Sequence, residues 1–308
     1  MKAIRIHRFG GPEVLSLDTL EPPTPIGEQA LVRVLAASVN PIDYKVRAGQ
    51  APGISMADLP MVLGRDLAGE VIAVGDGQHD LEIGDAVFAH LGWDRGGYAE
   101  QVLIASGEWA RKPEGLSFAR AASLAQVGDT AWQGLFDQGG LVSGQRVLIQ
   151  GATGGVGQIA VQLAHQAGAR VFATGPAAGQ SLLKQLGADE PIDYKAVRFE
   201  DIARDLDLVL DLVGGETRAR SWSLLKPDGV LVTTLGGADF AAEAKAAGRV
   251  GKAYLVRPKG DDLAEMADRA ARGELRIEIA ASFPLAQAAD AQSLLETAHP
   301  GGKIVLTF

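Results

Sequence analysis

The pattern of apolar and polar positions in the first 120 or so residues is one of short strands. Apolar or alternating runs of four to ten residues recur, and turn signals such as Gly75-Asp76-Gly77 and Gly84-Asp85 separate them. The predicted strands are Lys2–His7, Ala30–Val39, Gly69–Val74, Ala86–Ala89 and Tyr98–Ile104. Many short strands at this spacing predict a β-barrel-like domain.

Further along the chain, Ala-rich helical stretches alternate with short apolar strands. The predicted order is strand Arg146–Gln150, helix Gln158–Ala167, strand Arg170–Thr174, helix Gln180–Leu186, strand Ile192–Tyr194, strand Asp207–Val213, helix Thr217–Leu225, a turn at Pro227-Asp228-Gly229 and strand Val230–Leu235. Strands that alternate with helices predict a parallel sheet with right-handed crossovers.

The last fifty residues return to a mixed pattern. Helices are predicted at Asp261–Arg272 and Leu285–Thr297, and strands at Glu274–Ser282 and Lys303–Phe308. These strands could pair with the first domain, so a domain formed by two separate segments is expected.

Composition excludes several classes of function. The 29 basic and 38 acidic residues leave a net charge of −9, and no run of Lys or Arg exceeds two residues. Binding to nucleic acid or to an anionic membrane needs clustered cations, so neither partner is expected. No 18-residue apolar run and no signal peptide is present, and we therefore expect a soluble, cytoplasmic protein.

The metal-ligating and nucleophilic side chains are few. The chain has no Cys, which excludes disulfides, Cys-based zinc sites and thiolate catalysis. The five His residues are far apart in sequence: His7, His79, His90, His165 and His299. No metal site is predicted.

The most informative motif is a glycine-rich turn, Gly151-Ala152-Thr153-Gly154-Gly155-Val156-Gly157, between a strand and a helix. Its glycines follow a GxxGxxG spacing rather than GxGxxG. Small residues allow a sharp turn and a close approach of a pyrophosphate to the N-terminus of the helix. The turn predicts a dinucleotide site; the alternative is a strand-to-helix turn without a ligand.

The second strand of this unit bears on the choice of dinucleotide. An NAD site usually carries Asp or Glu about 20 residues after the first glycine. Here the strand ends in Thr174-Gly175-Pro176-Ala177, and no acid follows before Asp189, which permits NADPH. The candidate donors to a 2′-phosphate are Thr174, Ser181, Lys184, Tyr194 and Lys303. Lys184 could instead be a solvated helix residue, and Tyr194 could cap a short strand.

Eight segments in a fixed order resemble the zinc-free medium-chain dehydrogenase/reductases of the quinone oxidoreductase, or zeta-crystallin-like, branch. They are Asn40-Pro41-Ile42-Asp43, Gly64-Arg65-Asp66-Leu67-Ala68-Gly69-Glu70-Val71, Gly84-Asp85-Ala86-Val87, Gly97-Tyr98-Ala99-Glu100, Gly128–Gly134, the glycine turn, Leu186-Gly187-Ala188-Asp189 and Gly302-Lys303-Ile304-Val305. The resemblance covers essentially the whole chain.

The resemblance implies an α/β protein with a GroES-like β-barrel domain, residues 1–120 completed by 258–308, and a Rossmann NADP-binding domain, residues 121–257. The active site would lie where the domains meet. Zinc-using relatives carry a Cys where this chain has Asn40-Pro41-Ile42-Asp43, and Gly-His-Glu where it has Gly64-Arg65-Asp66. Without the Lewis acid, the hydride acceptor must already be electrophilic, as a quinone or a conjugated enone is.

The resemblance also implies roles for single residues. Thr130 and Gly154–Val156 would lie along the nicotinamide and the phosphates, and Val213, Leu235 and Gly236 would line the nicotinamide side. Asn40 and Asp43 would lie opposite, although Asn40-Pro41 is also a common turn pair.

Three aromatic residues complete the candidate site. Tyr44 is a candidate proton donor, with water as the alternative; relatives carry a Tyr one position later, where this chain has Lys45. Trp93 and Tyr254 could stack on a flat substrate, or could serve core packing or a subunit contact.

The function expected from these observations is NADPH-dependent hydride transfer to a small-molecule quinone. An enone or alkenal double-bond reductase and a non-enzymatic NADPH-binding protein remain open. An acyl-chain enoyl reductase would need a carrier-protein docking surface, which no basic patch indicates. Val250–Val256 is expected as an edge strand of the Rossmann sheet, and an exposed apolar edge favours a homodimer.

Overall fold

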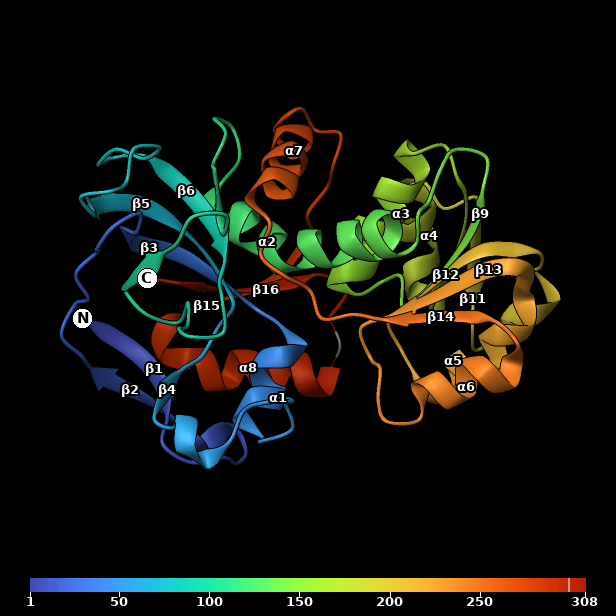
Figure 1. Cartoon of the computed structure of the whole chain (residues 1–308), viewed down its shortest axis with the longest axis horizontal. Helices are drawn as coiled ribbons and strands as arrows, with labels where there is room; N and C mark the ends of the chain where they lie inside the picture. Colours follow the sequence, from blue (N-terminus) through green and yellow to red (C-terminus); the bar gives the residue numbers. More distant parts are fainter. Residues whose placement is uncertain (299) are drawn as a thin grey trace. The chain divides into compact units, whose positions relative to one another are not determined.

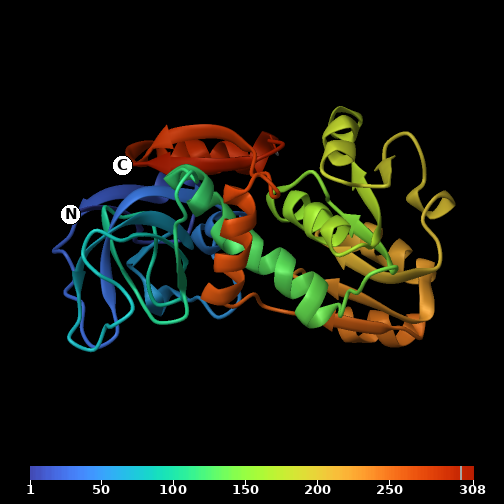
Figure 2. The same ribbon diagram turned by 90° about the horizontal axis from the view of Figure 1, so that it is seen from above.

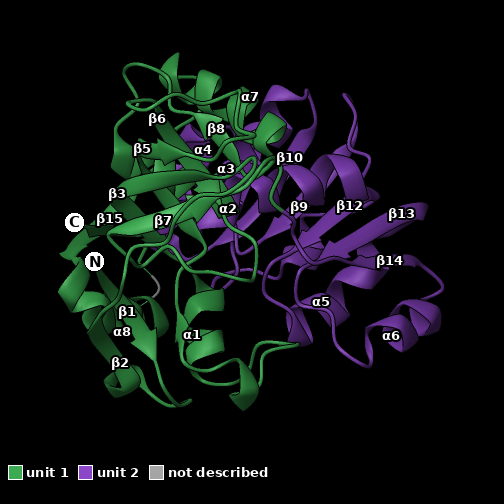
Figure 3. Ribbon diagram, turned by 60° about the vertical axis from the view of Figure 1, so that its left-hand side comes forward, with its two compact units in different colours: residues 1–126, 258–308 green, residues 127–257 purple. Residues whose placement is uncertain are grey.

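A computed structural model describes residues 1–298 and 300–308, so that His299 lies outside the described residues. The chain forms two compact units (Figure 3). Unit 1 comprises residues 1–126 and 258–308, and unit 2 comprises residues 127–257. The first boundary was expected at residue 120; it falls later because helix α2 (Phe118–Trp132) runs from one unit into the other.

Unit 1 contains two sheets. One has the order β2 (Leu15–Thr19), β1 (Lys2–Ile6), β4 (Met61–Val62). The other has the order β15 (Ile279–Pro284), β16 (Lys303–Thr307), β3 (Ala30–Val39), β5 (Asp66–Val74), β6 (Ala86–His90), β8 (Trp109–Arg111), and β7 (Gln101–Ile104) also pairs with β3. Both inner surfaces bury aliphatic side chains, as the alternating sequence pattern requires.

The C-terminal segment completes unit 1. Strand β16 runs antiparallel to β3, with Ile304 opposite Val39, and the red and blue strands lie together in Figure 2. The helices of this unit, besides part of α2, are α1 (Pro41–Arg47), α7 (Gly260–Ala271) and α8 (Ala288–Ala298). Arg47 of α1 is buried and donates to Gln292 of α8 through Nη1 at 2.8 Å, which joins the two segments.

Unit 2 is built on a six-stranded sheet in which every pair of strands is parallel. Its order is β11 (Glu190–Asp193), β10 (Arg170–Gly175), β9 (Arg146–Gln150), β12 (Leu206–Asp211), β13 (Leu225–Thr233), β14 (Val250–Ala253). Numbered within the unit, this is 3-2-1-4-5-6, the strand order of the Rossmann fold, whose ligand site lies where the order reverses, between β9 and β12.

Helices cover both faces of this sheet. In Figure 1, α3 (Gly155–Gln166) and α4 (Gln180–Gln185) lie on one side, and α5 (Gly215–Ser221) and α6 (Phe240–Ala247) lie on the other. Because neither face meets water, the strands are apolar on both sides, and Leu148, Val209 and Leu231 are fully buried. Within the described residues, no helix is long and apolar enough to cross a membrane.

Some element boundaries differ from those expected. Pro227-Asp228-Gly229 was expected as a turn, but it lies inside β13, where a register shift against β12 between Leu206 and Leu208 accommodates the irregularity. Helix α1, from Pro41 to Arg47, was not expected. The strand predicted from Glu274 begins only at Ile279.

Candidate functional site

The glycine turn of unit 2 joins β9 to α3 at the carboxyl edge of the sheet. Gly151 has a φ of +72°, which favours glycine, and the amide of Gly154 donates to the Gly151 carbonyl at 3.1 Å. A Cβ on Gly157 would stand 2.4 Å from that same carbonyl oxygen. Glycine is therefore required at both ends of the turn. The first amides of α3 have no partner within the helix and are free to bind an anion.

Thr174 supports this turn from the neighbouring strand β10. Its hydroxyl donates to Gln150 Oε1 at 2.7 Å and accepts the amide hydrogen of Gly151 at 3.2 Å. Thr174 was expected as a donor to a 2′-phosphate, but its side chain is 2% exposed and holds the turn instead. Gln150 was missed by the sequence reasoning; its amide also donates to Ser221 Oγ at 3.2 Å.

The end of β10 has no room for a side chain at Gly175. A Cβ there would lie 2.7 Å from Thr153 Cγ2 and 3.0 Å from Leu183 Cδ1. Gly175 pairs with Asp193 of β11, and the next residue, Tyr194, is 52% exposed. An NAD site would carry its acid near Gly175, at the carboxyl end of β10. Tyr194 follows the carboxyl end of the neighbouring strand β11, so it lies at the same edge of the sheet.

Two further loops leave the carboxyl edge after β12 and β13. Asp211, the last residue of β12, accepts the amide hydrogens of Val213 at 3.0 Å and Gly214 at 2.8 Å. Val213 is half exposed. After β13, the amide of Leu235 donates to Thr233 Oγ1 at 3.0 Å. Val213 and Leu235 therefore follow two adjacent parallel strands, and the first of these, β12, is also adjacent to β9, which carries the glycine turn.

Tyr254 is partly buried within unit 2. Its hydroxyl donates to the backbone carbonyl of Thr130 at 2.6 Å, and a Cβ on Gly134 would stand 2.6 Å from that hydroxyl oxygen. Burial raises the pKa of Tyr254. Of the alternatives given for Tyr254, these contacts favour core packing over stacking on a substrate.

Unit 1 contains a buried polar cluster formed by Ser38, Asn40, Asp66 and Lys303, here called the Lys303 cluster. Lys303 Nζ donates to Asn40 Oδ1 and lies 3.9 Å from Asp66 Oδ2. Asn40 Nδ2 donates to the same Asp66 oxygen at 2.7 Å, and the Ser38 hydroxyl also donates to it. Burial raises the pKa of Asp66, and the nearby ammonium of Lys303 opposes this.

The Lys303 cluster changes two expectations. Lys303 was expected to reach a 2′-phosphate in the Rossmann unit, but the residue is 5% exposed and its ammonium bonds to partners within unit 1, including the Val39 carbonyl at 3.3 Å. Asn40 was expected beside the nicotinamide or the substrate; both ends of its amide are used by Lys303 and Asp66. Asp66 was named from the sequence only as part of the motif Gly64-Arg65-Asp66 and not as a site residue, although a carboxylate within an apolar strand was a usable signal.

Asp43 lies in the first turn of helix α1 and caps its N-terminus together with Asn40. Its carboxylate accepts the amide hydrogen of Asn40 and the hydroxyl hydrogen of Tyr98, each at 2.8 Å. Burial raises the pKa of Asp43 to about 7. The neighbouring Tyr44 is partly exposed, and burial, followed by the negative charge of Glu296, raises its pKa.

Sequence and structure comparisons agree on the family. A model of the alcohol dehydrogenase GroES-like domain matches residues 27–114, and a model described as zinc-binding dehydrogenase matches residues 186–306. The NADPH-dependent alkenal/one oxidoreductase, chloroplastic, of Arabidopsis thaliana is 33% identical over 99% of this chain and 79% of its own. The chain belongs to the medium-chain dehydrogenase/reductase family.

Solved structures place the chain in the quinone oxidoreductase branch of this family. The quinone oxidoreductase from Coxiella burnetii has a TM-score of 0.94 and 38% identity, covering 100% of this chain and 99% of that one. The Escherichia coli quinone oxidoreductase complexed with NADPH has a TM-score of 0.90 and 27% identity, covering 100% of both chains. The expected branch and the expected pairing of a GroES-like domain with a Rossmann domain are confirmed.

The positions where zinc-using members of the family place a Cys and a His are filled by other chemistry. Asn40 belongs to the Lys303 cluster. The Arg65 guanidinium lies over the Trp93 ring, 4.1 Å from its centre, and donates to the Gly92 carbonyl. Trp93, itself in unit 1, is partly buried and packs against a hydrophobic core cluster of that unit. Among the residues that the structure describes, no three His, Asp or Glu side chains are grouped to hold a metal ion.

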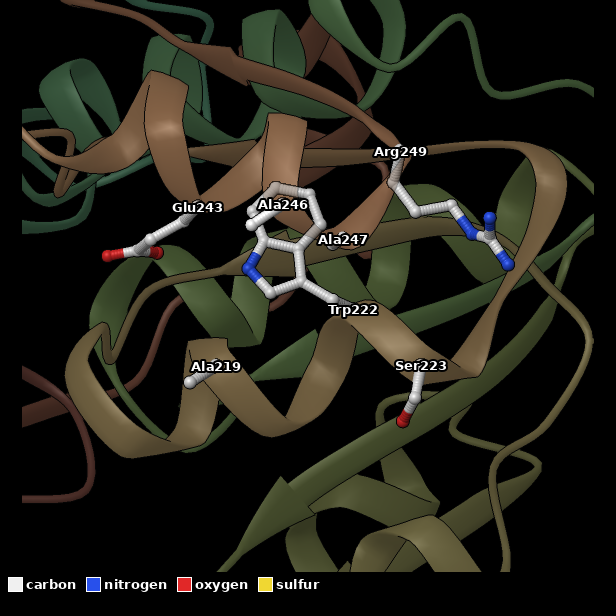
Figure 4. Close-up of a pocket in the computed structure, with 7 residues that line it drawn as sticks. All are labelled: Ala219, Trp222, Ser223, Glu243, Ala246, Ala247 and Arg249. Atoms are coloured by element: carbon white, nitrogen blue, oxygen red, sulfur yellow. The ribbon is translucent and has the colours of Figure 1, made fainter.

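A shallow groove on unit 2 lies away from this site (Figure 4). Trp222 forms its middle, with Glu243 and Arg249 on opposite sides. Arg249 directly precedes β14, and Ser223 closely precedes β13, so most of the groove lies toward the amino ends of the strands. Ligands of Rossmann units bind at the carboxyl ends, so the glycine turn, not this groove, is the candidate cofactor site.

Proposed function

We propose that this member of the family is a reductase that uses NADPH to transfer a hydride to a quinone and needs no zinc. The observation that carries the proposal is the carboxyl edge of the Rossmann sheet. There the glycine turn leaves the N-terminus of α3 open, Gly175 excludes an acid, and Tyr194 is exposed beside it. The Escherichia coli quinone oxidoreductase was solved as a complex with NADPH, which supports the same cofactor.

Each part of the edge has a defined task in this proposal. Backbone amides from Gly151 to Gly157 bind the pyrophosphate, because helix N-termini attract anions. Tyr194 donates to the 2′-phosphate, and Thr174 binds no phosphate but fixes Gly151. Thr130, Val213, Leu235 and Gly236 line the nicotinamide. The bound cofactor supplies the hydride, and these residues supply the orientation on which hydride transfer depends.

The substrate side is proposed to lie on unit 1. The Lys303 cluster and Asp43 hold the segment from Val39 to Arg47 in place, and neither Asn40 nor Asp43 needs to touch the substrate for this. Trp93, held by Arg65, provides an aromatic surface that suits a planar acceptor. Tyr44 is the proposed proton donor, with water as the alternative donor.

Zinc independence rests on the side chains that replace the ligands. Zn²⁺ prefers thiolate, imidazole and carboxylate ligands. Arg65 offers a guanidinium instead, and both ends of the Asn40 amide are already hydrogen-bonded, so neither residue is suited to binding zinc. Elemental analysis of the purified, untagged protein should give far less than one zinc per chain, and a chelator should leave turnover unchanged. Stoichiometric zinc together with loss of activity on chelation would contradict this part.

An alkenal or enone reductase is the second candidate, because the Arabidopsis thaliana relative is named for alkenals and enones. One preparation should be assayed for NADPH oxidation with 1,4-benzoquinone and with a short 2-alkenal. A higher kcat/KM with the quinone supports our proposal, and a higher value with the alkenal favours the second candidate. NADPH binding without turnover of either acceptor would favour a non-enzymatic NADPH-binding protein.

The cofactor preference is tested in the same assay by comparing NADPH with NADH. One or two charge-assisted contacts to the 2′-phosphate, each contributing about 1.5–3 kcal/mol, should favour NADPH at least about tenfold in kcat/KM. A ratio near one, or a preference for NADH, would contradict the proposal.

We also propose a cytoplasmic homodimer. Strand β14 is the last strand of the six-stranded sheet, and Val250 at its start is 48% exposed. An unpaired apolar edge strand tends to pair with another chain, and two copies of β14 would continue the sheet across a two-fold axis.

A further inference from the structure

We propose that Arg218 is a positioning residue for hydride transfer, which locks together the two loops that line the nicotinamide. This inference rests on the function proposed above and assigns a role to an ion pair, Arg218 with Glu243, that lies outside the glycine turn. The first loop is residues 212–215, which follow β12 and end on the first residue of α5, and the second is residues 234–237, which follow β13.

Asp211 is the inner anchor of both loops. The carboxylate is fully buried, and through Oδ1 it accepts the amide hydrogens of Val213 and Gly214. Through Oδ2 it lies 3.0 Å from the Thr233 hydroxyl, which in turn accepts the amide hydrogen of Leu235. Both loops therefore depend on the same carboxylate.

Arg218 of α5 is the outer anchor. Its Nη1 donates to the Leu235 carbonyl at 2.7 Å and lies 3.9 Å from Asp211 Oδ2. Its Nε and Nη2 donate to the two carboxylate oxygens of Glu243 at 2.8 Å and 2.9 Å. A bidentate pair fixes a planar guanidinium in orientation as well as position. Arg218 thus connects the start of the second loop to Asp211 and to helix α6.

The loop after β12 needs such an anchor because its backbone is unusual. Gly214 has φ +76° and ψ −165°, a conformation almost restricted to glycine, and Gly215 also has a positive φ of +55°. Two consecutive glycines give the loop many alternative conformations. A Cβ on Gly214 would lie 3.5 Å from Leu235 Cδ1 and 3.8 Å from Arg218 Nη1. Displacement of Arg218 therefore removes the bond to the Leu235 carbonyl and the packing beside Gly214, and leaves Asp211 as the remaining anchor of the two loops.

Glu243 holds the guanidinium from the solvent side. Its side chain is 31% exposed and forms one end of the groove in Figure 4. Phe240, also on α6, lies with its ring centre 5.4 Å from the same guanidinium. Removing the charge of Glu243 weakens the anchor without creating a cavity, so Glu243→Gln is a mild variant.

The same helix provides a matched control. Arg220, two residues after Arg218, makes an equivalent bidentate pair with Glu200, both distances being 2.6 Å. Glu200 lies in the short helical turn Phe199–Asp201, and no bond from Arg220 to either loop is present in the described residues. Arg220→Gln removes a comparable ion pair without releasing the loops.

The experiment compares Arg218→Gln, Arg218→Lys, Glu243→Gln and Arg220→Gln with the wild type. NADPH oxidation by 1,4-benzoquinone gives kcat and KM, and competition by 2′,5′-ADP reports binding of the adenosine half of the cofactor alone. We expect Arg218→Gln to lower kcat at least about tenfold, because small errors in orientation strongly slow transfer. Glu243→Gln should lower kcat several-fold, and Arg218→Lys should fall between Arg218→Gln and the wild type. In all four, the inhibition constant of 2′,5′-ADP should stay within about twofold of wild type, and Arg220→Gln should keep the wild-type kcat.

Several results would overturn the inference. Wild-type kcat in both Arg218→Gln and Glu243→Gln would show that the ion pair does not position the loops. An equal loss of kcat in Arg220→Gln, or a parallel loss of 2′,5′-ADP binding, would indicate a general structural role. If Arg218→Gln does not fold, Glu243→Gln and Arg218→Lys decide. The proposed function fails separately, if the wild type itself neither binds NADPH nor oxidises it.

Discussion

Replacing Lys303 by Met tests the buried cluster of unit 1 and the role of Lys303 together. The substitution keeps most of the side-chain volume and removes the ammonium that bonds to Asn40 and lies 3.9 Å from Asp66. Asp66 keeps its bonds from Ser38, from Asn40 and from the amide of Gln126 at 2.7 Å, but it loses the opposing charge.

The magnitude follows from the burial of both groups, with Lys303 5% and Asp66 0% exposed. At about 4 Å and an effective dielectric constant of about 20, two unit charges attract by about 4 kcal/mol. Breaking a buried pair typically costs about 3–5 kcal/mol, because one charge is left uncompensated. At about 2–4 °C per kcal/mol, Tm should fall by roughly 6–20 °C in differential scanning calorimetry.

The pH dependence of this loss has a definite sign. Burial raises the pKa of Asp66, and Lys303 lowers it. A carboxyl group whose pKa is raised by folding favours the folded state at low pH, and this contribution is lost as the pH rises. Without Lys303 the pKa of Asp66 rises further. The Tm deficit of Lys303→Met should therefore be largest near neutral pH and should shrink as Asp66 becomes protonated at lower pH.

Lys226→Met is the control, since Lys226 Nζ bonds to Asp207 at 2.6 Å but its side chain is 37% exposed. A surface pair contributes about 0–1 kcal/mol, so this variant should lose little. Adding Asp66→Asn to Lys303→Met should recover part of the loss. The reasoning fails if the two Lys variants lose the same stability, or if the deficit of Lys303→Met does not change with pH. A lower preference for NADPH in this variant would restore a cofactor role for Lys303.

Four shorter predictions follow from other positions. Tyr194→Phe should reduce the NADPH-to-NADH ratio of kcat/KM about tenfold, by loss of one hydrogen bond to a charged phosphate; an unchanged ratio would exclude the proposed contact. Gly157→Val should weaken NADPH binding at least about tenfold in a fluorescence titration, because its Cβ would stand 2.4 Å from a backbone carbonyl oxygen; wild-type affinity would contradict the close packing of the turn. Burial raises the pKa of Asp43 from 3.8 to about 7, so its contribution to stability is full below about pH 4, declines as the pH rises and is lost above about pH 7; Asp43→Asn should flatten the dependence of Tm on pH between about 4 and 7, and an unchanged slope would argue against that pKa. Val250→Lys should give a monomer mass in light scattering at micromolar concentration, whereas a dimer mass would place the interface elsewhere.

Much of the fold is readable from the sequence because local patterns carry it. The strands Ala30–Val39 and Arg146–Gln150 have the predicted bounds, since each is an uninterrupted run bounded by turn residues. Pro227-Asp228-Gly229 shows where this reasoning ends. Its residues favour a turn locally, but pairing of β13 with β12 keeps them within an irregular strand.

The candidate site also has one part that local sequence predicts and other parts that depend on tertiary contacts. The glycine turn is a local motif, and its geometry follows from its residues. The Lys303 cluster joins residues 263 positions apart, from Asn40 to Lys303, so no local pattern reveals that this lysine is buried. Arg218 and Arg220 are nearly adjacent and chemically identical, and only the tertiary contacts show that one of them bonds to Leu235.

The pairing of β16 with β3 has a consequence for how the protein is made. During synthesis, β3 emerges well before residues 258–308, and all of unit 2 is translated between them. Domains generally fold as units during translation, so unit 2 can fold while the β16-facing edge of β3, Ala36–Val39, still has no partner. An open apolar edge invites association with other chains, so nascent or truncated chains that lack the last strand should depend most on chaperones.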